Sequence, residues 1–174
     1  MIMKKTKLHL MALTVALTSV LISCDNDMIW DIAPIKIFIT VSDSEGQDLL
    51  NPDTPNSIDY REVTAEWRGE TYVGDTISLF TQQPLTRFLM GHMHGLVYLT
   101  EHGKSKLCFG ELTGHDTYVD EPLTLHWPDG STDVITIRAS AVEGYRSLKL
   151  NRKFKLNGKV VAKDTSSPEI NIVK

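Results

Sequence analysis

The sequence predicts an all-β protein, and three observations support this. Apolar residues alternate with polar ones over many short segments, which places the apolar side chains on one face of a half-buried strand. Turn-forming residues separate these segments at intervals of about 8–12 residues, as is typical of an antiparallel β-sandwich or barrel. No stretch of residues 24–174 carries the apolar stripe of an amphipathic helix. We therefore expect one antiparallel β-sandwich over residues 34–174.

The expected strands follow one another along the chain. Alternation is clearest in the first, where Ile35, Ile37, Ile39 and Val41 share one face. Shorter runs between turns are also expected to be strands. Alternation extends over residues 63–67, 123–127, 135–139 and 170–172, and the further apolar runs are residues 96–100, 106–109, 154–156 and 160–162.

The segments between these strands carry the residues that tight turns require. Asn157-Gly158 is the strongest short hairpin signal, because both residues tolerate positive φ. Pro128-Asp129-Gly130-Ser131 and His102-Gly103 predict two further hairpins, and Arg68-Gly69 predicts another. The Cys–Trp–Cys core of immunoglobulin domains is absent, so an Ig-like or Greek-key arrangement is expected from the strand pattern alone.

The first 23 residues are expected to be a signal peptide rather than a part of the fold. Lys4, Lys5 and Lys7 precede a mostly apolar run, Leu8–Ile22. That run is short for a helix that spans a bilayer, which needs about 20 apolar residues. The run ends in Leu21-Ile22-Ser23-Cys24, which resembles the bacterial lipobox. This resemblance implies lipidation of Cys24 and cleavage before it.

Residues 24–33 are predicted to be a short acidic tether between the lipid and the domain. Removal of residues 1–23 takes away three lysines and leaves 15 basic against 22 acidic residues, a formal charge of −7. Net acidity argues against a nucleic-acid partner and against electrostatic attachment to anionic headgroups. The expected partner is thus the membrane, reached through acyl chains on Cys24.

Several motifs together resemble a family of small lipoproteins from Bacteroides-type gut bacteria. They are Cys24-Asp25-Asn26-Asp27, the run from Val41 to Pro52, Cys108-Phe109-Gly110-Glu111-Leu112, His126-Trp127-Pro128-Asp129-Gly130, Leu156-Asn157-Gly158 and Ile170-Asn171-Ile172-Val173-Lys174. The resemblance implies an all-β sandwich on a lipid anchor and no assigned activity. In that group, acidic residues after the acylated cysteine act as an export signal, so Asp25 and Asp27 favour the outer membrane and the cell surface. In enterobacteria, aspartate at the same place would instead favour retention at the inner membrane.

One segment suggests metal chemistry. His92 and His94 are two residues apart, so on a strand both imidazoles point the same way and could bind one metal ion. A third ligand would have to come from elsewhere, and the residue types that can serve are present. The candidates are His102, His115 and His126 as ligands, with Asp116 or Glu101 as a base. The competing interpretation is a glycine-bounded turn with exposed histidines, so we expect no metal and no cofactor.

Other reactive residue types are expected to be structural. Cys108 lies in an apolar run with no nearby histidine, which predicts a buried, inert thiol. Trp67 and Trp127 lie on apolar strand faces and are expected in the core, whereas Trp30 and the tyrosines could form an exposed binding platform. The lysine-rich residues 149–159 are expected to be the solvated face of an edge hairpin.

The sequence thus predicts a lipid-anchored, non-catalytic binding or accessory module of the cell envelope, with a glycan or an envelope protein as its partner. Two alternatives stay open at this point: a metal-dependent enzyme that uses His92 and His94, and a structural subunit of the envelope.

Overall fold

The computed structural model describes residues 30–76, 94–144 and 147–174. The chain divides into two units, Met1–Trp30 and Asp31–Lys174, and the described fold belongs to the second. Cys24, His92 and the expected signal peptide lie outside the described residues. Among the described residues, no helix has the length and apolar character needed to cross a bilayer.

The predicted all-β class is confirmed for the described chain, which contains strands and one short 3-10 helix, η1 (Tyr60–Glu62). The strands are β1 (Ile35–Ser42), β2 (Thr64–Trp67), β3 (Glu70–Asp75), β4 (Leu96–Glu101), β5 (Lys104–Leu112), β6 (Tyr118–His126), β7 (Thr132–Gly144), β8 (Ser147–Leu156), β9 (Lys159–Lys163) and β10 (Glu169–Val173).

The strands join into one mixed sheet in the order β10-β1-β5-β4-β3-β2-β6-β7-β8-β9. Most neighbours are antiparallel, but β1 pairs with β10 and β3 pairs with β4 in parallel. The sequence predicts a purely antiparallel arrangement, and that prediction is wrong for these two pairs of strands. Parallel neighbours need a long connection, and β1 and β10 come from opposite ends of the domain.

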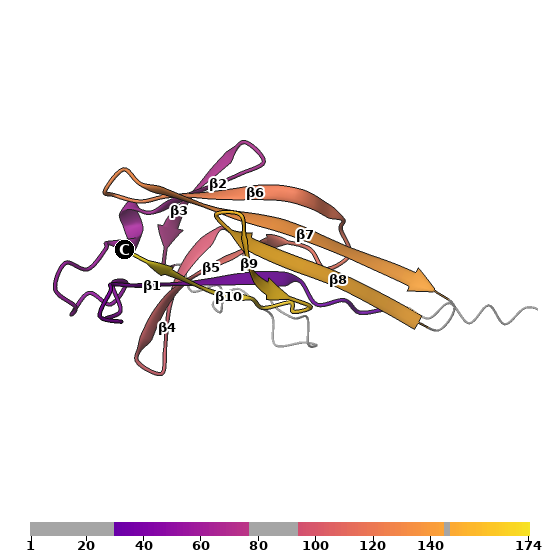
Figure 1. Ribbon diagram of the computed structural model, residues 1–174, viewed down its shortest axis with the longest axis horizontal. Coiled ribbons are helices and arrows are strands. Elements are labelled where there is room, and N and C mark those ends of the chain that lie inside the picture. Colours follow the sequence, from indigo (N-terminus) through magenta and orange to yellow (C-terminus); the bar gives the residue numbers. More distant parts are fainter. Residues whose placement is uncertain (1–29, 77–93, 145–146) are drawn as a thin grey trace, which may run out of the picture. The chain divides into compact units, whose positions relative to one another are not determined.

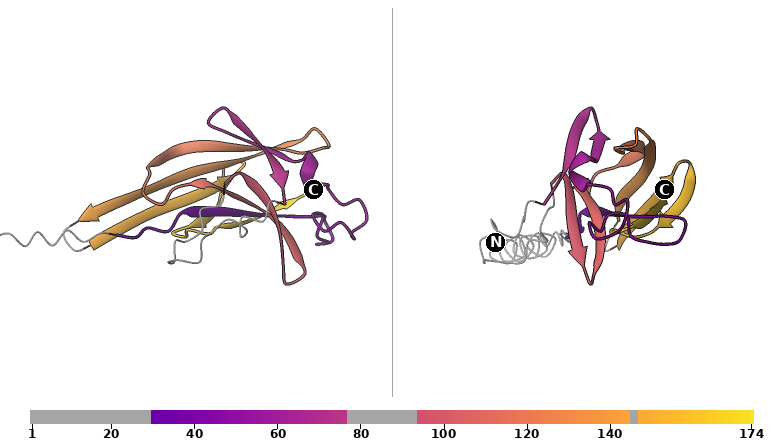
Figure 2. Two further views of the ribbon diagram at one scale, coloured as in Figure 1. Left: turned by 180° about the vertical axis from the view of Figure 1, so that it is seen from behind. Right: turned by 90° about the vertical axis from the view of Figure 1, so that its left-hand side faces the viewer.

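The sheet curls so that it is nearly a barrel. Its two end strands, β9 and β10, come close to each other. Figure 1 shows β6, β7 and β8 across from β1, β5 and β10, with β2, β3 and β4 linking the two groups, and Figure 2 shows the same strands from behind and end-on. The core fills the space between them.

Alternating apolar residues build this core as predicted. In β1, residues Ile35, Ile37, Ile39 and Val41 are buried and the residues between them are partly exposed. Trp67 packs in an edge-to-face manner against Phe109, with ring centroids 6.0 Å apart. Other large buried side chains come from both groups of strands: Leu96, Leu107, Leu112, Tyr118, Leu123, Leu125, Ile135, Ile137, Phe154, Ile170 and Ile172.

Three predicted two-residue turns connect consecutive strands. Arg68-Gly69 joins β2 to β3, His102-Gly103 joins β4 to β5, and Asn157-Gly158 joins β8 to β9. In each turn both residues have positive φ, from +48° at Asn157 to +84° at Gly158. This is the conformation of the hairpin turn that matches the twist of the flanking strands.

The chain is held against the domain before β1 begins. Ile32 is buried, and the carbonyl oxygen of Ala33 accepts a hydrogen bond of 3.4 Å from the Arg152 guanidinium. A Cβ atom at Gly114 would lie 2.3 Å from that same oxygen, so glycine permits this close approach. Packing thus extends into the last residues of the segment expected to be a tether.

Candidate functional site

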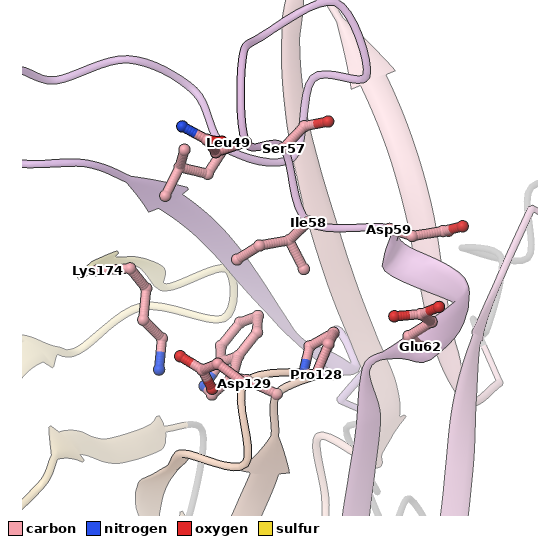
Figure 3. A pocket seen from close by; sticks show the side chains of 10 residues that line it. Leu49, Ser57, Ile58, Asp59, Glu62, Pro128, Asp129 and Lys174 are labelled. Carbon is pink, nitrogen blue, oxygen red and sulfur yellow. The ribbon is translucent and has the colours of Figure 1, made fainter.

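A hollow of about 360 Å³ opens at the end of the domain where the β6–β7 turn faces the loop before η1 (Figure 3). Its volume lies within the range of small-molecule sites, about 300–1,000 Å³. In Figure 3 the side chain of Ile58 lies between Leu49 and Pro128, and Lys174 faces Asp129. The lining residues come from the loop, the turn and the end of β10: Leu49, Asn56, Ser57, Ile58, Asp59, Glu62, Trp127, Pro128, Asp129 and Lys174.

A hydrogen-bonded network around Asp133 holds the β6–β7 side of the hollow. The indole Nε1 of Trp127 donates to Oδ2 of Asp133 at 2.8 Å, and Nδ2 of Asn157 donates to Oδ1 at 2.6 Å. The Lys174 ammonium lies 3.2 Å from the same carboxylate and 4.8 Å from the centroid of the Trp127 ring. These contacts hold the Trp127 indole and the Lys174 ammonium in place, because the Asp133 carboxylate that both contact is itself held by Asn157.

The charge of Asp133 is maintained in spite of burial. Burial by itself raises the pKa of a carboxyl group, but the hydrogen bonds from Asn157, Lys174 and Trp127 outweigh that effect. The pKa of Asp133 is therefore lowered, and the group is an anion at neutral pH. Lys174 is in turn committed to this anion, so it adds little free positive charge to the hollow.

The opposite wall is the loop that the sequence predicts over Asn51–Ser57, followed by η1. Asp59 caps η1 by accepting the Arg61 backbone N–H at 3.0 Å, and its carboxylate also pairs with the Arg61 guanidinium at 2.7 Å. The pKa of Asp59 is lowered, mainly by the hydrogen bond from the Arg61 side chain and to a lesser extent by the hydrogen bond from the Arg61 backbone N–H. On the other rim, the Ser131 hydroxyl and backbone N–H lower the pKa of Asp129.

The arrangement favours a neutral, polar ligand with an apolar face. Leu49, Ile58 and Pro128 offer apolar surface, and the carboxylates of Glu62 and Asp129 offer hydrogen-bond acceptors at the rim, whereas the carboxylate of Asp59 is engaged by Arg61. A ligand that carries hydroxyl groups and C–H surface can use both. An acidic ligand would be repelled by the carboxylates of Glu62 and Asp129.

The histidine pair that the sequence leaves open as an alternative metal site is described only in part. His92 lies outside the described residues, and the exposed side chain of His94 has its Nδ1 3.6 Å from Oε1 of Glu111. His102 lies at the other end of β4, and His126 pairs with Glu66 at 3.6 Å, so neither is near His94. Among the described residues, no group of three or more potential ligands is placed to hold a metal ion.

Cys108 and the two strand tryptophans are structural, as predicted. Cys108 is buried, and burial raises the pKa of its thiol to about 11. Trp67 and Trp127 are both buried. Among the tyrosines that the structure describes, Tyr118 is buried and Tyr60 stacks on Tyr98 with ring centroids 4.2 Å apart. Tyr145 of the expected platform lies outside the described residues.

The hollow is not predicted by the sequence. Ile58, Trp127 and Lys174 belong to segments that are far apart in the chain, and no spacing rule joins them. The sequence contains only weak indications of its two walls: a proline-containing loop at Asn51–Ser57 and a turn with proline and glycine at Pro128-Asp129-Gly130. Comparison with protein-family models, curated proteins and solved structures gave no match to this chain.

Proposed function

We propose that this chain is a lipid-anchored, non-catalytic binding module of the bacterial cell surface, and that the hollow beside Trp127 takes a neutral glycan. The hollow is the observation that carries the proposal. It combines apolar surface from Leu49, Ile58 and Pro128 with hydrogen-bond acceptors on a rim held by turns and by the Asp133 network. Sugars present the same combination of C–H faces and hydroxyl donors.

The cellular setting rests on the sequence. The basic start, the apolar run and Leu21-Ile22-Ser23-Cys24 support a lipid anchor on Cys24, and Asp25 and Asp27 support export to the surface. The resemblance to small lipoproteins of Bacteroides-type bacteria agrees with this setting. For the finer architecture we keep the proposal of a β-sandwich of Ig-like or Greek-key type; the two facing groups of strands support a sandwich (Figure 1), and the continuous sheet that joins them gives no support to Ig-like connections.

Binding is tested with the full chain, purified in detergent and applied to an array of neutral and acidic glycans. We expect neutral glycans to bind, and Glu62→Gln to weaken that binding about two- to tenfold because one strong acceptor is lost. Glu169→Gln is the matched control, since Glu169 is exposed on β10 and outside the hollow. Binding unaffected by Glu62→Gln, or equally weakened by both substitutions, would contradict the proposal.

The anchor is tested separately in cells. We expect labelled palmitate to enter the wild-type chain and the Cys108→Ala variant, but not the Cys24→Ala variant. The control is suitable because the Cys108 thiol is buried in the fold. A Cys24→Ala chain that still fractionates with membranes would refute the lipid anchor.

A further inference from the structure

Three cationic side chains stand in one row on the outer face of neighbouring strands. Arg138 of β7 lies opposite Lys153 of β8, and Lys153 lies opposite Lys163 of β9. Figure 1 shows these strands running side by side. Neighbouring strands are about 4.7–4.9 Å apart, so the row brings three positive charges close together. Ala139 and Phe154, the next residues along, point into the core.

Most of this charge is not neutralised within the described chain. Asp120 pairs with Arg138 and, at 3.2 Å, with Lys155. Within residues 30–76, 94–144 and 147–174, no carboxylate forms an ion pair with Lys153 or Lys163. Like charges directly opposite each other on adjacent strands destabilise the pairing. The row of cations therefore destabilises the pairing of these strands, in a chain whose net charge is negative.

The row borders a shallow groove of about 320 Å³. Ser140 and Asn151 lie opposite each other on β7 and β8, next to Arg138 and Lys153, and add a hydroxyl and an amide. Asp164 is the acidic residue of the lining. Arg152 also borders the groove, but its buried side chain lies on the inner face and donates to Ala33.

We propose that this outer face of β7, β8 and β9 binds an acidic polysaccharide, with its sulfate or carboxylate groups on Lys153 and Lys163. A bound oxyanion would remove the repulsion between the two ammonium groups. The neighbouring Ser140 hydroxyl and Asn151 amide would contact hydroxyl groups of the sugar rings, which a bare sulfate ion lacks. The site is separate from the hollow beside Trp127, which has acidic rims and suits a neutral ligand.

The experiment measures binding of the full chain in detergent to dextran sulfate, polygalacturonate and neutral dextran at low and moderate salt. We expect one or both acidic polymers to bind in a salt-sensitive manner and neutral dextran not to bind here. Lys153→Thr and Lys163→Thr should each weaken binding about two- to fivefold. Lys104→Thr, which removes an exposed lysine at the start of β5, should leave binding unchanged.

Thermal unfolding of the same variants separates a binding role from a folding role. Lys163→Thr should unfold at the same or a slightly higher temperature, because threonine suits strands and the repulsion is removed. The proposal is overturned if the folded lysine variants bind acidic polymers as the wild type does, or if Lys104→Thr loses as much binding. It is also overturned if anionic vesicles bind more tightly than the polymers. None of these outcomes bears on the neutral-glycan hollow, which Glu62→Gln tests.

Discussion

The indole Nε1 of Trp127 donates a 2.8 Å hydrogen bond to the buried carboxylate of Asp133, just beyond the β6–β7 turn. This contact fixes Trp127 at the end of the core, where the indole also borders the hollow. The same carboxylate receives Asn157 from the β8–β9 turn and Lys174 from beyond β10. One buried anion thus joins three segments that are distant in the sequence.

We expect Asp133→Asn to lower the free energy of unfolding by about 1.5–3 kcal/mol at neutral pH, because hydrogen bonds to a charged group and the Lys174 ion pair are lost. The pKa of Asp133 is lowered in the folded chain from an ordinary value of 3.8. Its contribution is therefore complete well above that pH and is lost as the pH falls through the folded-state pKa. Denaturant titrations between neutral and acidic pH measure both effects.

Asp53→Asn is the control for this prediction, since Asp53 lies exposed in the loop before η1. It should leave both the neutral-pH stability and its acid dependence close to those of the wild type. If the free energy of unfolding fell equally with pH in the wild type and in Asp133→Asn, the Asp133 network would not stabilise the domain as we predict.

Asn157→Ala is expected to destabilise the domain by about 2 kcal/mol. Asn157 adopts a φ of +48°, which costs alanine more than asparagine, and its side chain bonds both Asp133 and the backbone N–H of Val134. The measurement is chemical denaturation beside Asn151→Ala, which removes an exposed asparagine from β8. A similar loss of unfolding free energy in both variants would contradict the predicted contribution of the Asn157 turn and its hydrogen bonds.

Gly114→Ala should loosen the segment that precedes β1. The added Cβ would lie 2.3 Å from the Ala33 carbonyl oxygen and 2.7 Å from that of Ile32, and neither backbone atom can rotate away. We expect a loss of about 1–3 kcal/mol and faster proteolysis before residue 35. His115→Ala, at the exposed neighbouring position, should change neither quantity.

The thiol of Cys108 should resist alkylation in the folded protein. Burial raises its pKa to about 11, so little thiolate forms at mildly alkaline pH, and reagents cannot reach it. Mass spectrometry of the peptide that contains residue 108 should detect rapid modification only after denaturation, and none at this position in Cys108→Ser. Rapid modification of the native chain at Cys108 would mean that the core opens there.

The sequence by itself determined the all-β class, most strands and the tight turns. These features are local: alternation sets the buried face of a strand, and Asn157-Gly158 can adopt positive φ before any partner arrives. The burial of Trp67 and Trp127 follows from the same alternation, whereas Cys108 is buried within a continuous apolar run between Leu107 and Phe109. The proposed lipid anchor on Cys24 rests on the sequence alone.

The tertiary structure decided which strands meet and what lies between them. The parallel pairing of β1 with β10 joins residues such as Phe38 and Glu169, and no local pattern selects that partner. The register of β8 against β9 shifts between Phe154 and Lys155, and Lys153 lies opposite Lys163 beyond that shift. Counting residues outward from the turn therefore does not predict the cationic row. The hollow likewise exists only because a loop, a turn and β10 end at one place. Such features depend on long-range packing, which sequence spacing does not encode.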